Sequence, residues 1–129
     1  MPALNANQLS ELSVAFLSME KSIADFRLNF RNSLNQSQFH YLGMIQRSLL
    51  DTGEDLLAAS TCVILDEISG SLQRIEFLTS EVNVYLGKLE KIQDGMDMAA
   101  LILSLASAVF SKDPASISNA LYHLEKKIG

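Results

Sequence analysis

The feature that most constrains this fold is a row of apolar residues in the middle of the chain. The row advances by three or four residues at a time, which is the spacing that keeps side chains on one face of an α-helix. Only Thr79 interrupts it. The row consists of Leu65, Ile68, Leu72, Ile75, Val82, Leu86 and Leu89. We therefore expect the central helix of an all-α protein, packed along this seam in the manner of a coiled coil.

Similar spacing predicts two helices before this row. Over residues 9–30 apolar side chains recur every three or four positions, which indicates a helix of about seven turns. The polar cluster at 32–37 should end it, because hydroxyl and amide side chains compete for backbone hydrogen bonds. A second helix is expected from Ser37, with Gly43 as a weak point in its interior.

Two glycines decide where the central helix begins. Around Gly53 the seam loses register, and the acidic neighbours and the Thr52–Asp55 spacing suit the start of a helix. We therefore expect a break at Gly53 and one long helix over residues 54–92. Gly70 is the alternative point at which the chain could fold back.

Asp94-Gly95 predicts a turn, and an uncharged segment follows it. Residues 98–110 carry no charged side chain, so a short helix over about 98–111 should be buried in protein or lipid. It is too short to cross a bilayer, which takes about 20 residues, and a core helix is favoured. Asp113-Pro114 predicts the start of a last helix. Together these patterns predict one domain over residues 1–129, an elongated bundle of four to five helices in which the others are long and amphipathic.

The residue types required for catalysis or metal binding are few and scattered. Neither His40 nor His123 has an acidic residue three positions earlier, so the Glu-x-x-His pattern of di-metal bundles is absent. The single cysteine, Cys62, has no basic neighbour in the sequence that would favour its thiolate. We therefore predict no catalytic residues, no cofactor and no metal site, and a protein that is not an enzyme.

Acidic charge and surplus apolar surface together point to a protein partner. The net charge is -5, and residues 51–97 hold ten acidic against three basic side chains, which disfavours nucleic acid. The mean hydropathy of +0.17 is high for a small domain, so some apolar surface should stay exposed. Our candidates for partner binding are acidic side chains of the central surface and arginines, a residue type that is enriched at interfaces. They are Glu76, Glu81, Arg27, Arg31 and Arg47.

These observations favour a non-catalytic protein–protein interaction module of the chaperone, toxin-neutralising or adaptor type. A homodimer would use the same apolar surface. The start of the chain shows no basic and then apolar signal segment, so we expect a cytoplasmic protein. The alternative is a membrane-active protein that releases residues 98–110 from the bundle and inserts them into lipid.

Overall fold

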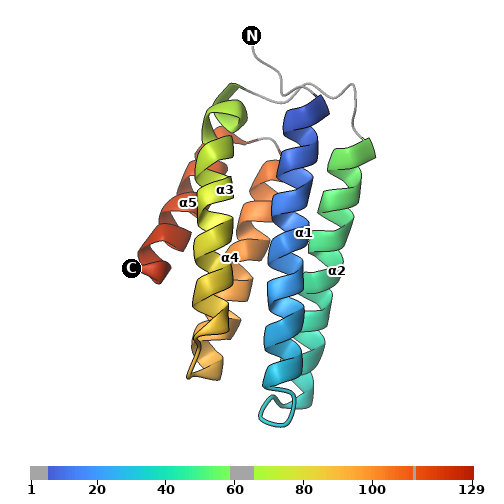
Figure 1. Cartoon of the computed structure of the whole chain (residues 1–129), viewed down its shortest axis with the longest axis vertical. Coiled ribbons are helices and arrows are strands. Elements are labelled where there is room, and N and C mark those ends of the chain that lie inside the picture. The colour runs from blue at the N-terminus through green and yellow to red at the C-terminus, as the bar shows by residue number, and fades with distance from the viewer. Residues whose placement is uncertain (1–5, 59–65, 112) are drawn as a thin grey trace.

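The computed structural model describes residues 6–58, 66–111 and 113–129, and this part of the chain forms an all-α bundle without strands (Figure 1). Its five helices are α1 (Ala6–Asn29), α2 (Gln36–Ala58), α3 (Asp66–Gly87), α4 (Ile92–Ser111) and α5 (Pro114–Ile128). The predicted fold class, an elongated bundle of four to five helices, is confirmed.

Successive helices run in opposite directions along the long axis of the bundle (Figure 1). α1 lies between α2 and α3, and α5 packs against α3 and α4. α4 contacts all four of the other helices, so the most apolar segment of the sequence is also the most central. α5 is shorter than its neighbours and stops well before the lower end of the bundle (Figure 1).

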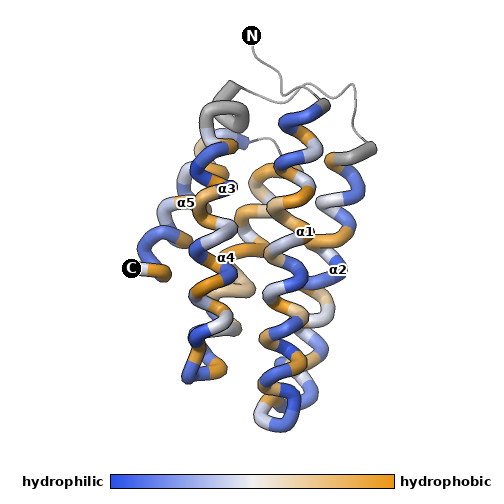
Figure 2. Tube along the Cα trace, viewed as in Figure 1, coloured by the Kyte–Doolittle hydropathy of each residue, from blue (hydrophilic) through white to orange (hydrophobic). Residues whose placement is uncertain are grey.

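The hydrophobic core takes side chains from all five helices, which accounts for the seams in the sequence. Hydrophilic and hydrophobic positions alternate along α1 (Figure 2), and its apolar side chains are the buried ones. On α3 the predicted row points inward, with Ile75 and Val82 fully buried. Thr79 is buried in the same row, where its hydroxyl donates a hydrogen bond to the carbonyl oxygen of Ile75 (2.8 Å). Leu65 lies outside the described residues.

The turn between α1 and α2 falls in the polar cluster of the sequence. The Oδ1 atom of Asn35 accepts a hydrogen bond from the backbone N–H of Gln38 (2.8 Å), and the Oε1 atom of Gln38 accepts one from the N–H of Asn35 (3.0 Å). This reciprocal cap satisfies two backbone donors at the start of α2. The predicted start of a helix near Ser37 is confirmed.

The predicted long helix over residues 54–92 is wrong. α2 continues through Gly53 to Ala58, and α3 ends at Gly87, with four residues between it and the start of α4. Gly53 lies at a contact with α1, where the hydroxyl of Ser13 donates a hydrogen bond to its carbonyl oxygen (2.7 Å) and Leu17 lies 2.9 Å from where a Cβ atom would stand. Gly70 lies inside α3, so neither glycine is the place where the chain folds back. Residues 59–65, between α2 and α3, lie outside the described part.

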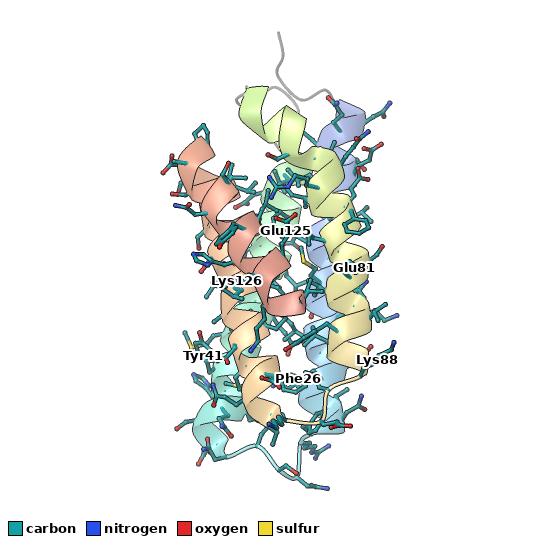
Figure 3. All side chains as sticks on the ribbon, turned by 90° about the vertical axis from the view of Figure 1, so that its left-hand side faces the viewer. Phe26, Tyr41, Glu81, Lys88, Glu125 and Lys126 are labelled. Atoms are coloured by element: carbon teal, nitrogen blue, oxygen red, sulfur yellow. The ribbon has the colours of Figure 1, made fainter. Side chains whose placement is uncertain are left out.

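The predicted turn at Asp94-Gly95 is also wrong. Both residues lie in the first turn of α4, which makes this helix 20 residues long. Gly95 is buried, and the ring of Phe26 occupies the space where a side chain would stand. Figure 3 shows Phe26 beside the first turns of α4. Gly95 therefore permits close packing between α1 and α4 and does not end a helix.

At this length α4 is the one helix of the described residues that is long and apolar enough to cross a membrane. This corrects the expectation that the segment is too short. Within its most apolar stretch, 44% of the residues are buried in the bundle. The core helix of a soluble protein meets the same criteria of length and composition, so these criteria alone do not assign α4 to lipid.

Candidate interaction surface

The outward side of α4 is an uncharged ridge. The helix turns its buried side chains toward the other four helices and exposes Ser107, Phe110 and Ser111, while Leu103 beside them is half-buried against the core. Leu103, Ser107 and Ser111 follow one another at steps of four, and Phe110 comes three residues after Ser107, so the four positions share one side of the helix. Phe110 is 66% exposed, the highest value among the large hydrophobic side chains of the described residues. We call these four residues the α4 ridge.

A groove of about 470 Å³ separates the α4 ridge from α5. The side chains that α5 contributes to it are small or neutral, apart from the imidazole of His123. On the α4 side, the hydroxyl of Ser104 donates a hydrogen bond to the carbonyl oxygen of Ala100 (3.2 Å), so it already has a partner within its own helix. This groove therefore presents little charge and little bulk to a molecule that would lie along it.

A second groove of about 470 Å³ lies on the other side of the ridge, against α2. Its α2 wall holds Asp51 and Asp55, which are one turn apart and share a face of that helix. Both are exposed, and no ion pair among the described residues involves either of them. The surface around the ridge is thus acidic on its α2 side and neutral on its α5 side.

The residues predicted to bind a partner lie elsewhere, in two groups. Arg27 lies in the last turn of α1, Arg31 lies two residues beyond the end of that helix, and Arg47 lies on α2 beside Arg27. Glu76 and Glu81 lie on α3, on the other side of α1 (Figure 1). The structure therefore does not bring the five residues into one surface. Their role in binding a partner stays a prediction.

Arg27 is already engaged within the bundle. Its Nε donates a hydrogen bond to the carbonyl oxygen of Phe39 (2.9 Å), and its Nη1 donates one to Oε1 of Gln46 (3.1 Å). Its guanidinium carbon also stands 3.8 Å from the centre of the Phe39 ring, a cation–π contact. Arg27 thus joins α1 to α2, while Arg31 and Arg47 are exposed.

The side chains that could take part in catalysis or bind a metal lie far apart. His40 lies on α2 and His123 on α5, and the described residues contain no cluster of three or more histidine, cysteine or acidic side chains that could hold a metal. Cys62 lies outside the described residues.

The pKa of Lys127 is raised above its ordinary value of 10.5, mainly because its ammonium group donates a hydrogen bond to Asp94 (3.2 Å). That contact ties the end of α5 to the first turn of α4.

The α4 ridge was not predicted from the sequence, although the spacing of serines in this segment indicates it. Residues 98–110 read as apolar all round, which suggests a fully buried helix. Yet Ser104, Ser107 and Ser111 follow one another at steps of three and four, so they share a face and give the helix a less apolar side. That spacing could have predicted one open face on α4.

Comparisons with known proteins add no functional assignment. No protein-family model matches the chain, and neither a curated protein nor a solved structure matches it. A functional interpretation must therefore rest on the geometry of the surface, because an all-α fold by itself does not define a function.

Proposed function

We propose that the protein is a non-catalytic interaction module that binds an amphipathic helix of a partner protein along the α4 ridge. The observation that carries this proposal is the exposed ring of Phe110 on an uncharged ridge between two grooves. An amphipathic helix in a groove is a common mode of peptide recognition. The small side chains of Ser107 and Ser111 would let its backbone approach α4 closely.

Charge adds a requirement on the partner. The carboxylates of Asp51 and Asp55, which form no ion pair with a described residue, line the α2 side of the ridge, so the partner helix should carry lysine or arginine on that flank. Complementary charge of this kind raises the association rate and excludes wrong partners more than it adds affinity. Chaperones, toxin-neutralising proteins and adaptors all act through such binding, and we propose a cytoplasmic protein of one of these types.

The ring of Phe110 sets the scale of the expected effect. Complete burial of a phenylalanine side chain is worth about 1.5–3 kcal/mol relative to leaving it exposed. If a partner covers this ring, Phe110→Ala should weaken binding by about tenfold or more, since 1.4 kcal/mol corresponds to a factor of ten. The chain offers a matched control, because Phe77 on α3 is exposed to a similar extent, 64% against 66%.

The test is affinity enrichment of the tagged protein from its native cells, followed by mass spectrometry and by affinity measurements with the purified partner. We expect a stoichiometric partner that Phe77→Ala retains and Phe110→Ala loses. The double variant Asp51→Asn with Asp55→Asn should slow association and reduce its dependence on salt. A partner that Phe110→Ala retains would contradict the proposal, as would one that both phenylalanine variants lose equally.

A second copy of the chain could cover the same ridge. Sedimentation velocity over a range of protein concentrations tests this, with the Phe110→Ala variant as the comparison. A dimer that dissociates in Phe110→Ala would replace the partner helix by a homodimer contact. A monomer at all concentrations leaves the ridge available for another protein.

The length of α4 favours a second candidate function, a membrane-active protein that inserts this helix into lipid. The test is co-flotation with vesicles of phosphatidylcholine and phosphatidylglycerol between pH 5 and 8. Ser107→Asp adds a charge to the exposed side of α4 without entering the core, so it should abolish co-flotation. If the unchanged protein does not float with the vesicles at any of these pH values, the membrane function is wrong.

A further inference from the structure

A depression of about 500 Å³ on the outer side of α1 and α2 concentrates positive charge on this acidic protein. Two guanidinium groups and one imidazole line it, and none of its lining residues is acidic. It lies apart from the α4 ridge and shares only Ser48 with the grooves beside that ridge. The lining residues are Arg27, His40, Gly43, Met44, Arg47 and Ser48.

Arg27 is held in place before any ligand arrives. Its contacts to Phe39 and Gln46 fix the plane of the guanidinium through Nε and Nη1. The remaining nitrogen, Nη2, makes no hydrogen bond to a described residue and lies over Gly43, where a Cβ atom would stand 2.8 Å away. Gly43, a weak point in the helix, thus lets the guanidinium lie flat on α2. A guanidinium fixed in this way loses little side-chain entropy when it binds an oxyanion.

The other basic groups share this face of α2. His40 precedes Gly43 by three residues and Arg47 follows it by four, so the three positions are neighbours on the helix surface. Arg47 is exposed, and no ion pair among the described residues involves it. The carboxylate of Glu20 accepts a hydrogen bond from Nε2 of Gln46 (2.9 Å), and so belongs to the network behind Arg27.

Asp51, one turn beyond Arg47, lines the groove against α4 and forms no ion pair with a described residue. The positive charge of Arg27 and Arg47 is therefore not matched by a carboxylate within the depression. Open donors beside unmatched positive charge are suited to an anionic ligand.

We propose that this depression binds an acidic peptide segment of a partner. Carboxylates of the segment would accept hydrogen bonds from Nη2 of Arg27 and from the guanidinium of Arg47. An apolar residue beside them would pack on Met44, whose side chain is 57% exposed in the same depression. That apolar neighbour favours a peptide over a free phosphate ion, which has no atoms to bury against a thioether. The inference does not depend on the α4 ridge.

The test is an NMR titration of the ¹⁵N-labelled protein at low salt with the acetylated, amidated peptide Glu-Leu-Glu-Glu. We expect saturable shifts of the amide signals of His40, Gly43 and Arg47. Arg47→Ala removes an exposed side chain that forms no ion pair with a described residue, so the fold should persist while the affinity drops about fivefold. Lys21→Ala is the matched control, since Lys21 is a basic residue exposed on α1, and it should leave the affinity unchanged.

Two further variants distinguish a peptide site from a phosphate site and from the α4 ridge. Met44→Ala should weaken binding of the peptide and leave binding of inorganic phosphate unaltered, because only the peptide has an apolar side chain. Phe110→Ala should change neither, which separates this site from the α4 ridge. The proposal is overturned if the peptide produces no saturable shifts, if Lys21→Ala weakens it as much as Arg47→Ala does, or if phosphate binds as tightly as the peptide and Met44→Ala affects neither.

Discussion

The packing of Phe26 against Gly95 makes a sharp prediction for the stability of the bundle. Gly95 is buried in the first turn of α4, and a Cβ atom built on it would overlap the ring of Phe26. The ring is 2% exposed and lies against Phe30, with 5.1 Å between the ring centres, so it has little room to move aside. We therefore expect Gly95→Ala to destabilise the protein, although alanine is the better helix former.

Two opposing terms set the size of the effect. Alanine in place of glycine inside a helix contributes about 1 kcal/mol of stability. Overpacking of a filled core costs about 1–3 kcal/mol, and the upper half of that range applies because the added atom meets three atoms of the Phe26 ring. The expected net change in the free energy of unfolding is a loss of about 1–2 kcal/mol. Urea unfolding followed by circular dichroism measures it, and the midpoint of thermal unfolding should fall by several degrees.

A matched glycine and a second-site change complete the experiment. Gly87, the last residue of α3, has no atom within 4 Å of the position of an added Cβ, so Gly87→Ala should be neutral or slightly stabilising. In the background of Phe26→Leu, Gly95→Ala should cost much less, with a coupling of about 1–2 kcal/mol between the two sites. If Gly95→Ala stabilises the unchanged protein, or costs the same in both backgrounds, the close packing of α1 on α4 is not what this residue provides.

Two further predictions concern polar contacts between helices. Ser13→Ala removes a buried hydroxyl that donates a hydrogen bond to the carbonyl oxygen of Gly53, and it should cost about 1 kcal/mol in urea unfolding; an unchanged midpoint would contradict this. Lys127→Met removes the contacts to Asp94 and Asp97 and should lower the thermal midpoint. Because the pKa of Lys127 is raised in the folded state, its contribution is fully present below its ordinary value of 10.5 and is lost as the pH rises through the folded value. The difference between variant and unchanged protein should therefore shrink in alkaline solution, and a difference that grows with pH would be inconsistent with this contact.

The sequence predicts the helices well where a single face is buried. α1 and α3 each bury one face against their neighbours, so their apolar residues repeat at steps of three and four and most of their buried residues belong to that row. The turn before α2 was also predictable, because the side chain of Asn35 competes for backbone hydrogen bonds and caps the start of a helix better than it fits the interior of one. In both cases the physical cause is local, and it is visible within a few residues.

The predictions at glycine and acidic residues were wrong where these residues contact helices far away in the sequence. Asp94-Gly95 has the composition of a turn, yet Asp94 bonds to Lys127 of α5 and Gly95 makes room for Phe26 of α1. Gly53 likewise sits under Leu17 of α1. A glycine fits a helix end because of its backbone freedom, and it fits a crowded helix crossing because it lacks a side chain. The sequence alone does not distinguish these two reasons.

The candidate surface depends on the same non-local information. Which side of α4 stays open is decided by where α2 and α5 pack, and those positions follow from contacts between residues far apart in the chain. Gly95 and Phe26 set how closely α4 approaches α1, while Lys127 fixes the end of α5 against α4. Because α5 contributes a wall to one groove beside the α4 ridge and α2 contributes a wall to the other, a change at these core contacts should also alter binding on the ridge. Gly95→Ala therefore tests the core and the surface together: if it destabilises the bundle and also weakens binding of a partner that Phe110→Ala loses, the packing of α1 on α4 is part of what shapes the binding surface.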